Sequence, residues 1–455
     1  MTASLSASCP ALFIAAPSSG QGKTTVTAAL ARFFARQGKD VRVFKTGPDY
    51  LDPQILAQAS GKHVEQLDMW MAGEAYCQQK LYEAAREADL ILVEGAMGLF
   101  DGEPSSADLA SRFNIPVALL MDVKGMAQTA AAIAIGLANF RDDVKFVGLI
   151  ANNCGSERHA QLIRDSLPDS LPLLSIFPRD EAVALPERHL GLVQPSEVGD
   201  ELDVRINNGA DQIGESLQRE DSGIAELPKP VEFFAVMEAA PEQSVDLSKV
   251  KIAVAKDEAF TFIYDANIRF LRELGAEVSF FSPLSDKALP EADALWFPGG
   301  YPELHAQQLS KNSSMIASVR DFSATDKPIL AECGGFLYCL ESLTDLQDVT
   351  YPMAGILAGE GAMRGKRGCQ GMQTAPLPEG EVRAHAHHRS RSSGTPEPIA
   401  HGRRQRHPAP GEAIFRERGL TATYLHLFFP SNPEAVAQLF KPQLGKELGQ
   451  MKATG

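Results

Sequence analysis

Short apolar runs alternate with longer amphipathic stretches over the first half of the chain. The runs are rich in leucine and β-branched residues and lie at 12–16, 41–44, 90–93, 117–121 and 146–151. The stretches between them are rich in alanine and have a helical period. This alternation is typical of repeated βαβ units, in which helices cover both faces of a parallel sheet. We therefore expect an α/β domain over residues 1–206.

The pattern fades after this domain and then resumes. Charged residues and prolines dominate residues 207–250, as in the run ELPKP at 226–230, and this composition predicts a linker. Apolar strand-like runs then return at 251–255, 277–281, 294–297, 328–330 and 423–428. They predict a second α/β domain over residues 251–455.

Composition and charge exclude several classes of protein. A formal net charge of -15 argues against nonspecific binding of nucleic acid, which depends on Lys and Arg. No apolar run approaches the ~20 residues that span a bilayer, so no membrane role is indicated. The apolar start lacks basic residues and leads into a glycine-rich loop, which predicts a first strand and not a signal peptide. Six scattered cysteines form no C-x-x-C pair, which suggests a reducing cytoplasm.

A candidate phosphate-binding loop follows the first strand. The run SSGQGKTT at 18–25 lies between an apolar strand and an alanine-rich helix, although Pro17 replaces the first glycine of the usual motif. Backbone N–H groups and a helix N-terminus cradle phosphates in such loops. We expect Lys23 to reach the terminal phosphates and Thr24 to ligate Mg²⁺. The predicted nucleotide-binding residues are Gly20, Gln21, Gly22, Lys23, Thr24 and Thr25.

Acidic residues stand at the ends of later strands. Asp49 and Asp52 follow the second strand, Glu94 ends the next apolar run and Asp101 comes shortly after it, while Asp122 is a weaker candidate. Ligands of open parallel sheets collect at the carboxyl ends of the strands, so these groups could converge on phosphates and a metal ion. Each acid alone could equally be an exposed turn residue. Together they favour a site.

A cysteine in the second domain is a candidate nucleophile. The run AECGGF at 331–336 places Cys333 on a sharp turn between a strand and a helix, where we expect the helix N-terminus to lower the thiol pKa. His426, in the run TYLHLFFPSN at 423–432, is a candidate base that must meet the cysteine in space. The alternative is a buried structural cysteine.

One tract is rich in arginine and histidine. Residues 383–407 hold six arginines and five of the ten histidines, mixed with Ser, Gly and Pro. The simplest interpretation is a solvated, poorly ordered loop; the alternatives are a lid over an acidic substrate or adventitious metal binding. The spacing of the histidines fits no familiar ligand set, so we predict no metal site there.

The motifs together, in order over nearly the whole chain, resemble the cobyrinic acid a,c-diamide synthase family. They are SSGQGKTT, KTGPDYLDP at 45–53, VEGAMGLFDG at 93–102, FPGGYPELH at 297–305, ECGGF and YLHLFFPSN. The resemblance implies a first domain like dethiobiotin synthetase and a second like class I glutaminases. It also implies a carbon–nitrogen ligase of cobalamin biosynthesis, which amidates the a- and c-acetate side chains of cobyrinic or hydrogenobyrinic acid with ATP and glutamine.

The resemblance also implies a mechanism. Cys333 attacks glutamine with His426 as base, and backbone N–H groups around Gly299, Gly300 and Gly334 stabilise the oxyanion. Ammonia then passes to the first domain, where ATP and Mg²⁺ have activated an acetate as an acyl phosphate. The family's positions for metal binding correspond to Thr24, Asp49 and Glu94, and those for substrate binding and transfer to Asp49, Tyr50, Asp52 and Asp101.

Two departures from the related patterns stand out. Class I glutaminases usually carry glutamate two residues after the histidine, where this chain has Phe428, so a Cys–His dyad is implied. Family members also tend to read HEFHYS where this chain reads HAHHRS at 385–390, without the acid.

Three alternatives stay open from the sequence. Cobyric acid synthase has the same two domains, but we would expect a Q-N motif in place of GPDY at 47–50. Nickel-sirohydrochlorin a,c-diamide synthase shares GPDY. A partition-type P-loop ATPase would explain residues 1–200 but not the second domain. We expect a corrinoid substrate, no nucleic-acid or membrane partner, and a homodimer as one option for assembly.

Overall fold

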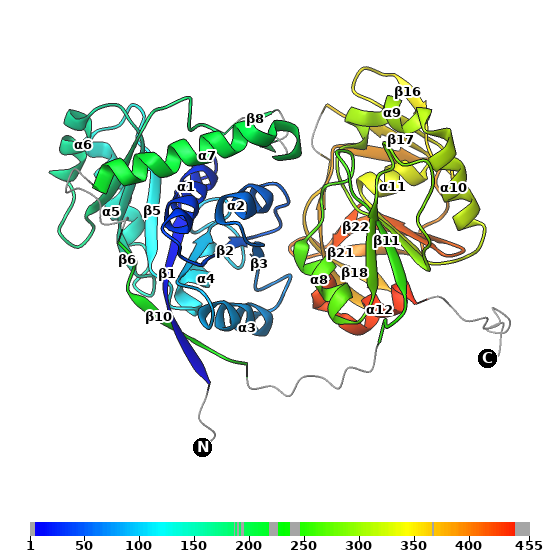
Figure 1. Cartoon of the computed structure of the whole chain (residues 1–455), viewed down its shortest axis with the longest axis horizontal. Coiled ribbons are helices and arrows are strands. Elements are labelled where there is room, and N and C mark those ends of the chain that lie inside the picture. The colour runs from blue at the N-terminus through cyan, green and yellow to red at the C-terminus, as the bar shows by residue number, and fades with distance from the viewer. Residues whose placement is uncertain are drawn as a thin grey trace. The chain divides into compact units, whose positions relative to one another are not determined.

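The computed structural model divides the chain into two compact units, Met1–Ala239 and Ala240–Gly455 (Figure 1). It describes residues 5–185, 187–188, 191–192, 195–217, 226–236, 246–365 and 368–441. Each unit contains helices packed on a sheet with parallel strands, which confirms the predicted α/β class for both. Among these residues, no helix combines the length and apolar character needed to cross a membrane.

The first unit is built on a parallel sheet with the strand order β3-β2-β4-β1-β5-β6-β7. Its strands are β1 (Ser6–Ala15), β2 (Val41–Thr46), β3 (Glu65–Leu67), β4 (Leu90–Glu94), β5 (Val117–Asp122), β6 (Phe146–Cys154) and β7 (Leu173–Pro178). A further strand, β10 (Pro230–Phe234), pairs antiparallel with the first half of β1, and a small pair is formed by β8 (Glu187–Arg188) and β9 (Gly191–Leu192). The central position of β1 places the loop that follows it at the middle of the carboxyl edge.

Helices cover both faces of this sheet. They are α1 (Lys23–Arg36), α2 (Asp52–Ser60), α3 (Glu74–Ala85), α4 (Ser106–Arg112), α5 (Gln128–Ala138), α6 (Glu157–Arg164) and α7 (Pro195–Leu217). In β5, Ala118 and Leu120 pack into the core under α1, α2 and α7, whereas Leu119 and Met121 pack against α5 and α6. Burial on both faces explains why these strands are continuous apolar runs in the sequence.

Parts of the expected linker, residues 207–250, are secondary structure of the first unit instead. Helix α7 continues to Leu217 and lies along α1 and α2, with Ile206, Ala210 and Ile213 buried (Figure 1). Their spacing of three to four residues is that of an amphipathic helix. Residues 230–234 form β10, in which Val231 and Phe233 are buried in alternation. Residues 218–225 and 237–245 lie outside the described residues.

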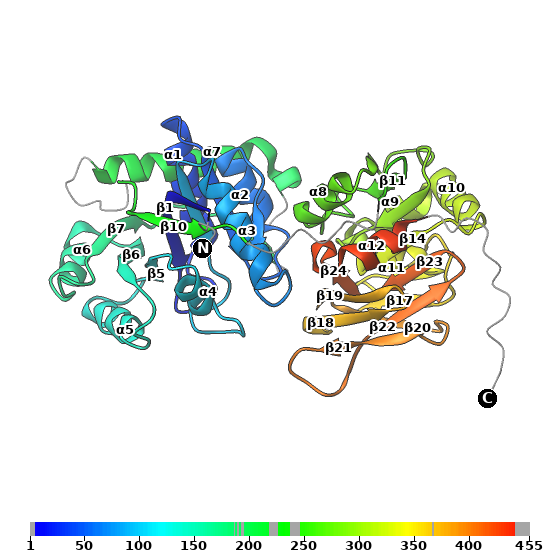
Figure 2. The same ribbon diagram turned by 90° about the horizontal axis from the view of Figure 1, so that it is seen from below.

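The second unit is built on a mixed sheet with the order β12-β11-β13-β14-β23-β22-β21-β18-β19-β24. Its parallel part consists of β11 (Lys251–Ala255), β12 (Glu277–Phe281), β13 (Ala294–Phe297), β14 (Ile329–Glu332) and β23 (Leu420–Thr423). The antiparallel part consists of β18 (Gln370–Leu377), β19 (Gly380–His387), β21 (Ala400–Arg404), β22 (Pro410–Glu417) and β24 (Leu425–Leu427) (Figure 2). A smaller sheet is formed by β15 (Ser342–Thr344), β16 (Thr350–Pro352), β17 (Glu360–Met363) and β20 (Ser390–Ser393).

The helices of the second unit also pack on two faces. They are α8 (Asp265–Glu273), α9 (Ala306–Lys311), α10 (Ser313–Ser323), α11 (Gly334–Cys339) and α12 (Pro433–Phe440), with short 3₁₀ turns η1 (Pro302–His305) and η2 (Phe429–Ser431). Leu295 and Phe297 of β13 face the core that includes α10 and α11. Ala294 and Trp296 face the core that includes α8 and α12.

The expected strand at 423–428 is divided in two. β23 ends at Thr423 beside β14, and β24 begins at Leu425 and pairs antiparallel with β19. β24 nevertheless contacts the end of β14, since the Leu427 N–H donates a hydrogen bond to Glu332 Oε1 at 2.8 Å. This contact brings His426 back toward the end of the strand that precedes Cys333.

The tract 383–407 is not the poorly ordered loop that the sequence suggested. It contains the end of β19, all of β20 and β21, and their backbone groups are paired in ladders. Val382, Ala384 and Ala386 alternate into the core and are fully buried, while Arg383 points outward. The period of two was present in the sequence, but the charged residues and histidines between the small apolar ones obscured it.

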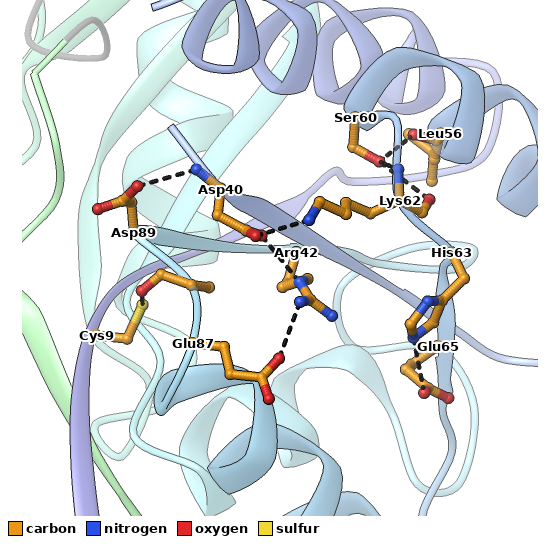
Figure 3. Close-up of polar contacts among 11 residues, drawn as sticks. Cys9, Asp40, Arg42, Leu56, Ser60, Lys62, His63, Glu65, Glu87 and Asp89 are labelled. Carbon is orange, nitrogen blue, oxygen red and sulfur yellow. Dashed lines mark hydrogen bonds and ion pairs between the residues drawn. The ribbon is translucent and has the colours of Figure 1, made fainter. Parts of the chain in front are cut away.

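A polar network lies at the amino ends of β2 and β4, opposite the carboxyl edge of the sheet (Figure 3). The Asp40 carboxylate accepts from Arg42 Nε at 2.9 Å and from Lys62 Nζ at 2.8 Å. Arg42 also pairs with Glu87 at 3.0 Å, and Asp89 accepts from the Asp40 N–H at 2.9 Å. These contacts are partly exposed and tie the starts of two strands to the end of α2.

Candidate active site

The predicted phosphate loop connects β1 to α1 at the centre of the sheet. Gly20 and Gly22 adopt positive φ angles of 77° and 90°, which glycine adopts without strain. The end of β6 packs closely against the loop, because Asn152 Nδ2 donates to the Gln21 carbonyl at 2.9 Å and a side chain on Gly22 would clash with Asn152. Thr24 and Thr25 follow in the first turn of α1. All six predicted nucleotide-binding residues therefore belong to one loop and one helix start.

Lys23 lies across this loop. Its ammonium donates to the Ser18 carbonyl at 3.0 Å and to the Met97 carbonyl at 2.8 Å. Burial, and then the nearby Lys45, lower the pKa of Lys23 to about 8. An anionic phosphate in the loop would favour the charged ammonium over these neutral partners.

The acids at the strand ends converge as expected. β2 and β4 pair with Lys45 opposite Glu94, and the Lys45 ammonium lies 2.7 Å from Glu94 Oε1 and 2.8 Å from Asp52 Oδ2. Asp49 Oδ2 lies 4.0 Å from the same ammonium, and Thr24 Oγ1 donates to Glu94 Oε1 at 2.9 Å. Lys45 was not among the predicted site residues. The available signal was a lysine close to the carboxyl end of a predicted strand, at the start of the KTGPDYLDP motif.

Burial governs the electrostatics of this cluster. It raises the pKa of Glu94, which is 0% exposed, although Lys45 opposes the shift. Burial acts on Asp52 in the same direction, but Lys45 outweighs it and holds the pKa of Asp52 below its usual value. For Lys45 itself, burial would lower the pKa, and Asp52, Glu94 and Asp49 together raise it. The cluster therefore has a buried ion pair of Lys45 and Glu94 at its centre, with Asp52 and Asp49 partly exposed beside it.

The donor set of this cluster suits a hard divalent cation. Thr24, Asp49 and Glu94 present only oxygen atoms, the type that Mg²⁺ prefers. Glu94 Oε2 is buried and has no hydrogen-bond partner among the described residues, which leaves one carboxylate oxygen for a further ligand. The predicted metal-binding residues thus fit the ion.

The other candidate site residues of the first unit, Asp101, Tyr50 and Asp122, differ in their surroundings. Asp101 Oδ2 accepts from the Gly98 N–H at 3.2 Å, next to the Met97 carbonyl that holds Lys23. Tyr50 is buried in the turn between β2 and α2. Asp122 accepts from Asn153 Nδ2 at 2.9 Å while its N–H donates to Gln21 Oε1 at 2.8 Å, so it supports the phosphate loop.

Cys333 occupies the sharp turn that the sequence predicted. It caps the N-terminus of α11 with φ 46° and ψ -100°, a conformation that L-residues rarely adopt and that is characteristic of functional turns. A side chain on Gly335 would clash with the Phe297 carbonyl, and one on Gly334 would come within 2.9 Å of Gly300 N. The turn therefore packs directly on the glycines that follow β13.

His426 lies against the same glycines. A side chain on Gly299 would clash with His426 Cε1, so the imidazole contacts this glycine face. His426 pairs with His385 across β24 and β19, and both histidines are buried. The predicted oxyanion residues thus lie close to both candidates, because Gly334 follows Cys333 and packs against Gly300, while Gly299 packs against His426.

The expected effect of the helix N-terminus on the thiol is wrong. Burial raises the pKa of Cys333, and Glu303 adds to the increase, while the Gly334 N–H opposes it only in part. Burial also lowers the pKa of His426, with further contributions from His385, His387 and His388. At neutral pH the pair therefore consists of a thiol and a neutral imidazole, which can accept the thiol proton.

The HAHHRS segment at 385–390, which lacks the acid of the related motif, contacts a carboxylate from another strand. His388 Nε2 lies 3.3 Å from Glu412 Oε2 of β22, and the His388 ring stacks on Tyr424 with centroids 3.9 Å apart. Glu412 follows the HAHHRS segment by more than twenty positions, so its proximity could not be inferred from the motif. No group of three or more candidate ligands for a metal ion occurs in the described parts of the chain, the histidine tract included.

The chain matches two domain families in the order that the fold presents. Residues 12–193 match the CobQ/CobB/MinD/ParA nucleotide binding domain, and residues 251–434 match the CobB/CobQ-like glutamine amidotransferase domain. The hydrogenobyrinate a,c-diamide synthase of Stutzerimonas stutzeri is 50% identical over 437 residues, which cover 96% of this chain and 100% of that protein. The chain belongs to the a,c-diamide synthase family.

Two further relatives support this membership. The hydrogenobyrinate a,c-diamide synthase of Pseudomonas aeruginosa is 50% identical over 436 residues, covering 96% of this chain and 98% of that protein. The cobyrinate a,c-diamide synthase of Herminiimonas arsenicoxydans is 46% identical over 434 residues, covering 95% and 97%. As a member of the a,c-diamide synthase family with both domains, the protein is a ligase that uses ATP and takes nitrogen from glutamine. A partition-type ATPase is excluded by the second domain.

Proposed function

We propose that this enzyme amidates the a- and c-acetate side chains of hydrogenobyrinic or cobyrinic acid, and thus acts in cobalamin biosynthesis. Sequence identity of 46 to 50% over almost the whole length of three synthases named for these substrates carries the proposal. It favours these corrinoids over the substrates of cobyric acid synthase and of the nickel-sirohydrochlorin enzyme.

The first unit would activate the carboxylate. The backbone N–H groups of the 20–25 loop bind the ATP phosphates, and Lys23 turns from its two carbonyl partners toward them. Thr24, Asp49 and Glu94 would hold Mg²⁺, which neutralises phosphate charge and orients the transferred group. Asp52, Asp101 and Tyr50 help to position the substrate. The phosphorylated acetate is an acyl phosphate, a far better electrophile than the free carboxylate.

The second unit would supply ammonia. His426 accepts the Cys333 proton as the sulfur attacks the glutamine amide carbon, and the backbone N–H groups near Gly299, Gly300 and Gly334 stabilise the oxyanion. One such donor is commonly worth about 3 kcal/mol. The C–N bond then breaks to give a γ-glutamyl thioester and ammonia. Ammonia displaces phosphate from the acyl phosphate, and water releases glutamate from the thioester.

The cellular setting remains a prediction. The scattered free cysteines favour a reducing cytoplasm, and the negative net charge favours a partner other than nucleic acid. Assembly as a homodimer stays a prediction that light scattering can test.

The product mass tests the proposed function. We expect purified protein with ATP, Mg²⁺ and glutamine to convert hydrogenobyrinic or cobyrinic acid to a product in which two carboxyl groups have become amides. Lys23→Ala is the control, since it removes the phosphate-binding ammonium and should form no amide from either glutamine or ammonia. An unchanged substrate mass with both corrinoids, or equal conversion by the control, would contradict the proposal.

A further inference from the structure

A buried carboxyl group connects three strands of the second unit. Glu332 is the last residue of β14, directly before Cys333, and only 1% of it is exposed. Its Oε2 accepts from Trp296 Nε1 at 3.0 Å, and its Oε1 accepts from the Leu427 N–H at 2.8 Å. Each oxygen therefore binds a different strand.

Each of the three strands carries one part of the glutaminase site. β14 leads into Cys333, β13 leads from Trp296 into the Gly299–Gly300 turn, and β24 contains His426 immediately before Leu427. On one side of His426, the Thr423 carbonyl at the end of β23 accepts from the Cys333 N–H at 2.8 Å. On the other side, β24 pairs with β19 and not with β14, and the bond from Leu427 to Glu332 adds a second connection to the strand that precedes Cys333.

This chain lacks the glutamate that usually orients the catalytic histidine in class I glutaminases. The position two residues after His426, where class I glutaminases usually carry glutamate, is Phe428, which is fully buried and packs on Tyr264 at a ring distance of 5.5 Å. A carboxyl group is nevertheless present one residue before the nucleophile. It acts on the backbone beside His426 and not on the imidazole.

We propose that Glu332 is a positioning residue for glutamine hydrolysis, which holds the strand of His426 and the turn of Gly299 and Gly300 against the Cys333 turn. It contacts neither glutamine nor the reacting atoms. The proposal rests on the proposed function, because it assigns Glu332 to the glutaminase step of that reaction.

Glu332→Gln is the direct test. A carboxamide has one accepting oxygen, so its NH₂ group must face either the Leu427 N–H or the Trp296 N–H, and one strand loses its connection. We expect kcat for glutamine hydrolysis to fall at least about tenfold with KM changed less than about twofold. Amidation supported by ammonia should stay within about twofold of wild type, since it does not use this unit.

Trp296→Phe offers a rescue. The substitution removes the indole N–H and keeps an aromatic ring in the core. In the double variant the carboxamide oxygen can accept from the Leu427 N–H while the carboxamide NH₂ group occupies the space beside the new phenyl ring. The value of kcat should therefore recover at least about threefold from that of the single Glu332→Gln variant. Trp296→Phe alone keeps the Leu427 bond and should lower kcat only about threefold.

Glu379→Gln is the matched control. Glu379 pairs with Arg416 at 2.7 and 3.0 Å in the same unit, and its side chain is 14% exposed. This variant also replaces a carboxyl group that accepts two hydrogen bonds, but it should hydrolyse glutamine like wild type.

Several results would overturn the proposal. Wild-type kcat in folded Glu332→Gln would do so, as would equal losses in Glu332→Gln and Glu379→Gln, or a double variant no better than the single one. If Glu332→Gln does not fold, the variant Trp296→Phe tests the proposal in its place. An unchanged kcat for glutamine hydrolysis in Trp296→Phe would then contradict the proposal. Failure of the proposed function looks different, because wild type would then form no diamide even with ammonia.

Discussion

Glu94, at the end of β4 in the first unit, is buried beside the Lys45 ammonium, whereas Glu332, at the end of β14 in the second, is buried with two neutral N–H donors. Both are the last residue of an apolar parallel strand. We attribute the difference in their surroundings to the charges that each half-reaction of the proposed function involves. In that proposal the first unit binds anionic phosphates and a carboxylate, and its set of ions could rearrange around a nucleotide and a cation.

The second unit acts on a neutral amide and excludes charge. Burial raises the pKa of Glu332 to about 8 and that of Cys333 still further, and it lowers the pKa of His426. A neutral imidazole next to a thiol can act as a base, which an imidazolium cannot. Burial disfavours the charged form of a group in both units. In the first unit an ion pair with Lys45 offsets this cost, whereas in the second unit the buried groups adopt their neutral forms.

Removing the Lys45 ammonium from the first unit should have the largest effect on stability. Lys45→Met leaves the buried Glu94 and the partly exposed Asp52 without their ammonium, and we expect the free energy of unfolding of this unit to fall by about 3 to 5 kcal/mol. Denaturant unfolding at pH 7 measures it. A loss below about 1 kcal/mol would show that the cluster is not held together by Lys45.

The second unit should instead respond to pH. The unfolded Glu332 carboxyl loses its proton near pH 4.5, while the folded one keeps it until about pH 8, so stability due to this group falls as pH rises between these values. The slope is at most about 1.4 kcal/mol per pH unit. Thermal unfolding of wild type against Glu332→Gln from pH 5 to 8 should show a slope that the variant lacks. Parallel curves would contradict the assignment.

Glu94→Gln should separate the two half-reactions. It removes an oxygen that we assign to Mg²⁺, so we expect diamide formation to fall at least about tenfold, a barrier increase of ~1.4 kcal/mol, while glutamine hydrolysis stays measurable. The assay compares amide and glutamate production by folded protein at saturating Mg²⁺. Equal diamide formation by variant and wild type would reduce Glu94 to a structural residue.

The smallest effect is expected at the exposed network of Figure 3. Lys62→Met makes the same substitution as Lys45→Met, but at a side chain that is 41% exposed and pairs with Asp40 at 2.8 Å. Exposed pairs contribute about 1 kcal/mol or less, so stability should hardly change. A loss as large as that of Lys45→Met would mean that burial does not explain the difference between the two lysines.

Much of the fold could be predicted because parallel strands are buried on both faces. Runs such as 117–121 are apolar at every position for that reason, and glycines mark the turns after β1, β13 and β14. Residue types also predicted Cys333 as nucleophile and His426 as base, and both lie against the glycines that follow β13. The antiparallel strands between 370 and 417 were not predicted, and in β19 and β21 the reason is that arginines and histidines stand between the small apolar residues.

The residues that the sequence did not reveal are those whose roles depend on what lies across the sheet. Lys45 and Glu332 look like ordinary charged residues at strand ends, where most would be exposed. Only the register of β2 with β4 brings Lys45 to Glu94, and only the return of β24 to β14 brings Leu427 to Glu332. The raised pKa of Cys333 likewise follows from its burial, which a six-residue motif does not indicate.

We assign glutamine hydrolysis and carboxylate activation to different units, and the variant Cys333→Ala separates the two. Diamide formation by this variant should be measured with ATP and either glutamine or a high concentration of ammonium salt. We expect no product from glutamine and a rate close to wild type from ammonia, because the first unit is intact. Normal product formation from glutamine, or loss of the ammonia-supported reaction in folded protein, would contradict this assignment.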